Sequence, residues 1–159
     1  MEEDKMLELY LIQGQIQKLV ETNEMTRTFG LALTEEDAKL LAERRVETLK
    51  EQQRVEFGDG ILPRLIFAFC DSTYIDQENY VDTISRLQEI FYLYKNESMD
   101  ELTDDELIEL MKDAFDGECE GSLEYLEETA LEDFARSIRR EGKSFLGRHY
   151  RIRGYDDEL

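Results

Sequence analysis

ILPRLIFAFC, residues 61–70, contains the longest fully apolar run of the chain, from Leu65 to Cys70. Removing this much apolar surface from water is favourable, so we expect the stretch to lie at the centre of the core. Pro63 suits the first turn of a helix, where its missing N–H would have no partner. A run this short is also consistent with a buried strand. We predict a buried helix, with the strand as the open alternative.

Helical patterns flank this stretch on both sides. On the N-terminal side, Thr34 is followed three residues later by Asp37, an acidic variant of the capping box that starts a helix. That helix is expected to end at the turn signal Gly58-Asp59-Gly60. On the C-terminal side, apolar residues recur at spacings of four, three, four and three, the clearest helical pattern in the chain: Tyr80, Ile84, Leu87, Phe91 and Tyr94.

Further helices are predicted toward both ends of the chain. The first should bury one face and fade around residues 23–30, and its apolar stripe is Leu9, Ile12, Ile16, Leu19 and Val20. Thr103 and Glu106 form a capping box that starts another helix. A last helix starts at Ser122, and its apolar stripe is Leu131, Phe134, Ala135 and Ile138.

These segments predict an all-α protein, a compact bundle of about six helices. The 159 residues include one proline, which leaves room for uninterrupted helices. This length is near that of one typical domain. We expect a single acidic helical domain over residues 1–142. A basic and aromatic tail, residues 143–159, should follow it, irregular or strand-like in form and packed on the domain.

The net charge of the chain limits the classes of molecule that it can bind. Asp and Glu number 39 against 19 Lys and Arg, so the formal net charge is −20. This charge repels phosphate backbones and anionic lipid surfaces, so we expect no nucleic-acid and no membrane partner. The first residues are acidic and unlike a secretory signal, no apolar run reaches membrane-spanning length, and two cysteines are no disulfide framework. We therefore expect a cytoplasmic protein.

The acidity is concentrated in one region. Residues 97–133 hold sixteen acids and one base, whereas residues 136–153 hold seven bases and one acid. The simplest interpretation is that residues 97–133 form a solvated acidic face and that the basic residues 136–153 pack against this face. Our main hypothesis is a docking surface for a basic protein, and a nucleic-acid mimic is an alternative. The expected contact residues are Glu109, Asp113, Glu118, Glu120, Glu124, Glu127 and Glu128.

Residues 116–127 are similar to an EF-hand calcium loop. Acids fall at loop positions one, three, five, nine and twelve, and Gly121 falls at position six. This similarity implies Ca²⁺ ligands at Asp116, Glu118, Glu120 and Glu127. Glu in place of Asp or Asn at positions three and five departs from the pattern, and no second loop is present. A plain helix–turn–helix connection capped by Ser122 is the favoured interpretation, with no cofactor.

Catalytic motifs are scarce. The one histidine, His149, lies in the basic tail, and the sequence has no Walker A loop, GxGxxG or HExxH. The two cysteines, Cys70 and Cys119, are far apart, and Cys70 is expected to be a core residue. We expect a protein that is not an enzyme. Carboxylate-based catalysis stays open because acids are so abundant. The oligomeric state is also open.

Three stretches carry a family resemblance: LTEEDAKLLAERR (residues 33–45), VEFGDGILPRLIFAFCDS (55–72) and DGECEGSLEYLEE (116–128). They resemble a family of small acidic bacterial proteins known only as a domain of unknown function. The resemblance implies no activity, ligand or site, and it supports a bacterial, cytoplasmic setting. Our hypothesis remains a protein–protein interaction module that presents an acidic face to a basic partner.

Overall fold

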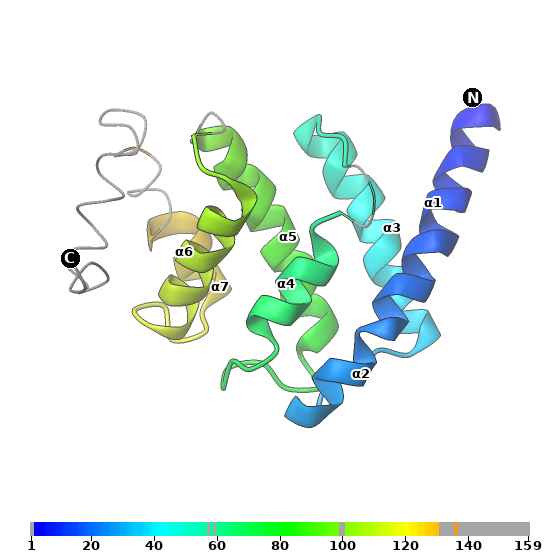
Figure 1. Ribbon diagram of the computed structural model, residues 1–159. Coiled ribbons are helices and arrows are strands. Elements are labelled where there is room, and N and C mark those ends of the chain that lie inside the picture. Colours follow the sequence, from blue (N-terminus) through cyan, green and yellow to red (C-terminus); the bar gives the residue numbers. More distant parts are fainter. Residues whose placement is uncertain (1, 57, 59, 99–100, 131–135, 137–159) are drawn as a thin grey trace. The chain divides into compact units, whose positions relative to one another are not determined.

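The computed structural model describes residues 2–56, 58, 60–98, 101–130 and 136, and all regular structure in these residues is helical. The prediction of an all-α protein is confirmed. In chain order the elements are α1 (Glu2–Glu21), α2 (Asn23–Thr26), the 3₁₀ turn η1 (Arg27–Phe29), α3 (Glu35–Gln52), α4 (Leu62–Phe69), α5 (Tyr80–Glu97), α6 (Asp104–Asp116), α7 (Leu123–Tyr125) and the π-helical turn η2 (Leu126–Ala130) (Figure 1). The chain divides into two compact units, residues 1–90 and 91–159.

Within residues 61–70, Leu62–Phe69 form the helix α4, so the strand alternative is wrong. Pro63 lies in its first turn, where a missing N–H costs nothing. Four apolar side chains at spacings of three, one and three are fully buried, which is the pattern of one helical face: Leu62, Leu65, Ile66 and Phe69. Phe67, on the opposite side, is 44% exposed. The helix α4 therefore forms part of the core of the first unit.

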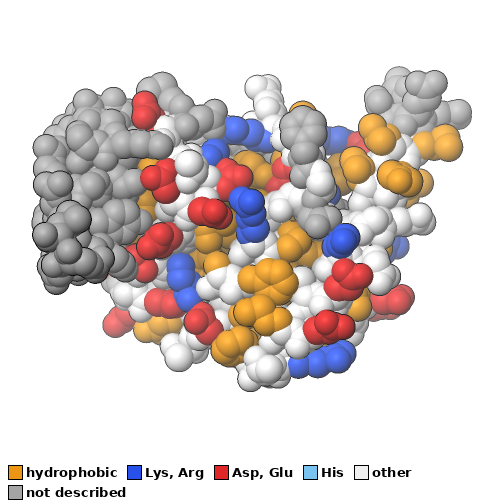
Figure 2. All heavy atoms as spheres, viewed as in Figure 1, with side chains coloured by type: hydrophobic (Ala, Val, Ile, Leu, Met, Phe, Trp, Pro, Cys, Tyr) orange, Lys and Arg blue, Asp and Glu red, His pale blue; other side chains and the backbone are white. Residues whose placement is uncertain are grey.

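The helix α1 packs mainly against α3 and also contacts α4 (Figure 1). Leu19 is fully buried, but Leu9 is 60% exposed, so the predicted stripe holds at one end only. Several large apolar side chains on the N-terminal half of α1 are exposed to solvent and lie close together (Figure 2). Glu8 of α1 forms an ion pair with Lys50 of α3.

The chain stays helical after α1, where the sequence pattern predicted fading. Asn23 makes this possible, because its side chain accepts a hydrogen bond from the Leu33 N–H at 2.7 Å and donates one to the Leu33 carbonyl at 2.8 Å. The Thr26 hydroxyl also donates to the Leu31 carbonyl. Gly30 ends the turn at φ +80°, a conformation that favours glycine. Buried polar side chains therefore replace the missing apolar stripe.

The capping box at Thr34 and Asp37 is confirmed, and it starts α3. This helix ends at Gln52, before the glycine turn predicted to stop it, because Gln53 adopts a left-handed conformation at φ +55°. In the loop that follows, Gly60 has φ +73°, and a Cβ there would lie 2.4 Å from a Glu56 carboxylate oxygen. Only glycine fits this position.

A buried ion pair connects this loop to the helices of the first unit. Glu56 accepts a hydrogen bond from the Arg45 guanidinium at 2.5 Å and another from the Ile61 N–H at 2.7 Å. The Arg45 and Glu56 side chains are 6% and 5% exposed. Arg45 also donates to the Gln15 side chain of α1. The pair therefore links α1, α3 and the start of α4.

In the second unit, α6 begins at the predicted capping box of Thr103 and Glu106. Its apolar stripe is buried: Leu107, Leu110, Met111 and Ala114. Ser122 caps α7 as predicted, by accepting a hydrogen bond from the Tyr125 N–H. The predicted stripe over residues 131–138 and the tail over residues 143–159 lie outside the described residues. Among the helices described, none is long and apolar enough to cross a membrane.

Candidate functional site

Residues 116–128, which we call the acidic turn, run from the end of α6 through α7 into η2. Their backbone reverses tightly after α6. The Cys119 N–H donates to the Ala114 carbonyl at 2.9 Å, and the Gly121 N–H donates to the Phe115 carbonyl at 2.8 Å. Glu120 and Gly121 both adopt positive φ, at +47° and +81°. Because these bonds tie the turn to the last residues of α6, its conformation is fixed before any partner binds.

Buried side chains anchor the acidic turn at both ends. Cys119 is 4% exposed, and Leu126 is fully buried. The Tyr94 hydroxyl donates to the backbone carbonyl of Glu127. Burial, together with the negative charge of Glu118, raises the pKa of the Cys119 thiol to about 11. At neutral pH this thiol keeps its proton, so it is a packing residue and a poor nucleophile.

Most of the predicted contact residues lie on the surface of the acidic turn and α6, and Asp and Glu side chains gather there (Figure 2). Five are exposed: Glu109, Glu118, Glu120, Glu124 and Glu128. Asp113 and Glu127 are half-buried. Tyr125 stands among these acids with 42% of its surface exposed.

The acids of the turn differ in whether they are paired. Asp116 forms an ion pair with Lys112, one helical turn earlier, at 3.3 Å. By contrast, four exposed glutamates have no ion pair with any residue that the structure describes: Glu118, Glu120, Glu124 and Glu128. The turn therefore presents four negative charges that no described cation neutralises, around one exposed aromatic ring.

The calcium hypothesis named Asp116, Glu118, Glu120 and Glu127 as ligands. Within the described ranges, no three His, Cys, Asp or Glu side chains come together in a way that could hold a metal ion. Asp116 is engaged with Lys112, and Ser122 caps α7. Calcium binding stays a prediction that a titration can test.

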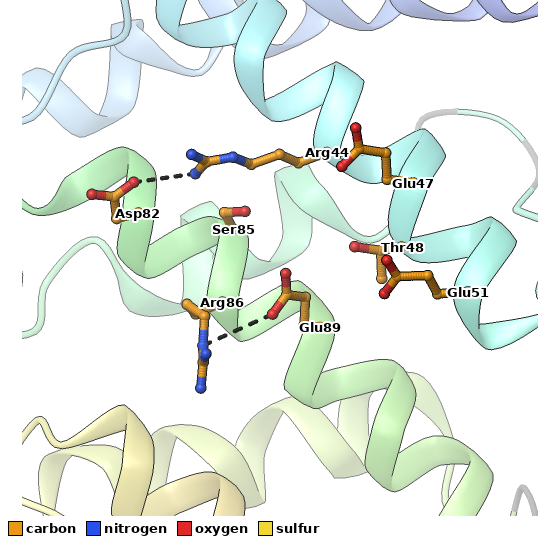
Figure 3. A pocket seen from close by; sticks show the side chains of 8 residues that line it. All are labelled: Arg44, Glu47, Thr48, Glu51, Asp82, Ser85, Arg86 and Glu89. Carbon is orange, nitrogen blue, oxygen red and sulfur yellow. Dashed lines mark hydrogen bonds and ion pairs between the residues drawn. The ribbon is translucent and has the colours of Figure 1, made fainter.

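A second polar surface lies in the first unit, in a groove of about 400 Å³ between α3 and α5 (Figure 3). We call it the α3–α5 groove. Eight residues line it: Arg44, Glu47, Thr48 and Glu51 from α3, and Asp82, Ser85, Arg86 and Glu89 from α5. Two ion pairs lie along it, between Arg44 and Asp82 at 3.1 Å and between Arg86 and Glu89 at 3.9 Å.

The sequence did not predict this groove, because the acids that line it lie outside the concentrated acidic region of residues 97–133. A signal was present, since the four lining positions on each helix have the same spacing of three, one and three. Residues 44, 47, 48 and 51 thus share one face of α3, and residues 82, 85, 86 and 89 share one face of α5. A pattern within one helix cannot show that the faces of α3 and α5 lie opposite each other.

Comparison with known proteins gives one match. A family model described as "Family of unknown function (DUF6323)" matches residues 18–144. No curated protein matches the chain. No solved structure matches it either.

Proposed function

Because the chain belongs to the family of unknown function DUF6323, we propose a role from its own residues: a non-enzymatic interaction module that presents the acidic turn to a basic protein surface. One observation carries the proposal. Glu118, Glu120, Glu124 and Glu128 are exposed, carry no ion pair with a described residue, and stand on a turn that hydrogen bonds tie to the last residues of α6. We expect this binding to take place in the bacterial cytoplasm.

Two terms contribute to the binding free energy of such a contact: the charges of the four glutamates and the packing of Tyr125. A single exposed ion pair contributes less than about 1 kcal/mol, so four glutamates alone make a weak contact. Their larger effect is on association rate and on the choice of partner, because a net charge of −20 steers basic surfaces toward the molecule. Tyr125, which follows Glu124 in the chain and is 42% exposed, supplies apolar area, as interface tyrosines commonly do. We therefore expect fast, salt-sensitive binding in which Tyr125 contributes most of the affinity.

Affinity capture from the native host, with the bound proteins identified by mass spectrometry, tests the proposal. The test variant replaces Glu118, Glu120, Glu124 and Glu128 with Gln. The control variant replaces Glu21, Glu24, Glu43 and Glu78, four exposed acids of the first unit, with Gln. Both changes move the net charge from −20 to −16, because each removes four negative charges.

The expected result is a basic partner that elutes as salt is raised, is lost with the test variant and is kept with the control variant. Tyr125→Ala should lower the affinity for that partner by about tenfold or more, the usual size of a hot-spot effect. An equal loss of capture with both glutamine variants would mean that only the overall charge matters. Unchanged capture by the test variant would show that the acidic turn is not the contact surface.

A further inference from the structure

Two hydroxyl-bearing side chains with little exposed surface line the α3–α5 groove. Thr48 and Ser85 are each 5% exposed, and neither hydroxyl makes a hydrogen bond with a residue that the structure describes. Both line the groove, and Figure 3 shows their oxygen atoms directed into the space between the two helices. No described residue bonds to these two oxygens, so each can accept a hydrogen bond from a ligand in the groove.

The charge of the groove favours a cationic ligand. Four carboxylates line it against two guanidinium groups, which leaves an excess of two negative charges. Arg44 reaches across to Asp82, and Arg86 pairs with Glu89. Glu47 and Glu51, which lie one helical turn apart on α3, are exposed and form no ion pair with a described residue. The unbalanced charge is therefore on the α3 side, beside the Thr48 hydroxyl (Figure 3).

We propose that the α3–α5 groove binds a guanidinium group, as carried by an arginine side chain. A guanidinium is planar and carries five N–H donors, so one group can reach hydroxyl and carboxylate acceptors on both helices at once. A compact ammonium group with three donors matches fewer of these acceptors. A metal ion fits less well, because in the described residues no three acidic side chains converge to hold one. The site lies in the first unit and does not rest on the acidic turn.

The direct test titrates the full chain with N-acetyl-arginine amide and follows assigned backbone amide resonances. We expect saturable shifts confined to α3 and α5. N-acetyl-citrulline amide keeps the shape of the side chain and removes its charge, and it should bind about tenfold more weakly or worse, a difference of about 1.4 kcal/mol. N-acetyl-lysine amide keeps the charge and should also bind more weakly than the arginine compound.

Matched variants separate the groove from general charge attraction. Glu47→Gln with Glu51→Gln should weaken arginine binding by about tenfold or more. Glu36→Gln with Glu43→Gln, two other exposed acids on α3, makes the same change of net charge from −20 to −18 and should leave binding unchanged. Ser85→Ala should reduce the preference for arginine over lysine while leaving thermal unfolding near that of the wild type.

Several results would overturn the proposal: equal binding of arginine and lysine compounds, equal loss in the two double variants, or no saturable shift in the groove. A tripeptide with a central arginine identifies the source of the group. Tighter binding of the tripeptide would assign the groove to a protein partner, and equal binding would assign it to a free small molecule. Both results support guanidinium binding.

Discussion

Glu56 and the glutamates of the acidic turn have the same side chain in opposite settings. Glu56 is 5% exposed, is paired with the Arg45 guanidinium, and accepts a hydrogen bond from the Ile61 N–H. The glutamates at positions 118, 120, 124 and 128 are exposed and unpaired among the residues described. A carboxylate therefore stabilises the fold where it is buried with its partners. Where it is solvated and unpaired, its charge is available to another molecule.

The largest expected effect comes from breaking the buried pair. Glu56→Gln leaves the Arg45 charge buried without a counter-charge, which costs about 3–5 kcal/mol of unfolding free energy. Urea denaturation measures this loss directly. Glu43→Gln, an exposed acid on the same helix as Arg45, is the control and should change stability by less than about 0.5 kcal/mol. A Glu56→Gln protein as stable as the control would show that the pair does not hold the loop.

A second substitution removes the packing that anchors the acidic turn while keeping all of its charges. Leu126→Ala deletes a fully buried side chain and should cost about 3 kcal/mol of unfolding free energy. Leu7→Ala, at a leucine that is 58% exposed, is the control and should cost far less. Thermal or urea unfolding compares the two. If the two losses were similar, the anchoring role assigned to Leu126 would be wrong.

Rising pH should destabilise the same turn through Cys119. The folded state raises the pKa of this thiol from its ordinary value near 9 to about 11, because burial disfavours the thiolate. The proton is held more tightly when the chain is folded, so this stabilisation is complete below about pH 9. It is lost as the pH rises from about 9 through about 11, and the full loss amounts to about 3 kcal/mol. Unfolding curves at pH 8 and pH 10.5 measure it.

Cys119→Ala is the control for that pH effect. With no thiol to ionise, the variant should show a smaller decline between pH 8 and pH 10.5 than the wild type. Burial also raises the pKa of Tyr80 in the first unit from 10 to about 12, so a decline that begins near pH 10 should remain in the variant. Identical declines in wild type and variant would show that Cys119 is not the group responsible.

The smallest expected effect is that of the exposed glutamates on stability. Replacing Glu118, Glu120, Glu124 and Glu128 with Gln should change the unfolding free energy by less than about 0.5 kcal/mol. Any change should favour the folded state at low salt, because like charges no longer repel one another. A loss of more than about 1 kcal/mol would mean that these acids help to hold the fold, and the contrast with Glu56 would then fail.

Local patterns predicted the parts of this fold that depend on neighbours in the sequence. The capping boxes at Thr34 and Thr103 involve residues three positions apart, so their spacing alone identifies them. The helix over residues 62–69 could be predicted as buried. The same short apolar run did not distinguish a helix from a strand, because both bury such a run.

Contacts between distant residues were not predictable in this way. Asn23 bonds to Leu33, ten residues away, and Glu56 pairs with Arg45 across a loop. No periodic signal marks a polar residue as buried, because the same residue type is more often exposed. The α3–α5 groove needed the placement of two helices. The composition and spacing of the acidic turn predicted its charge and its Ser122 cap, but not its hydrogen bonds to the carbonyls of Ala114 and Phe115.

The two cysteines have a consequence for measuring how this molecule opens. Cys70 is 3% exposed in the first unit, and Cys119 is 4% exposed in the second. A thiol reagent can reach either sulfur only when the surrounding structure opens, so each labelling rate reports a local opening equilibrium. Comparing the rates of Cys70→Ala and Cys119→Ala proteins would show whether the two units open together or one before the other. The native sequence thus carries one built-in reporter of motion in each unit.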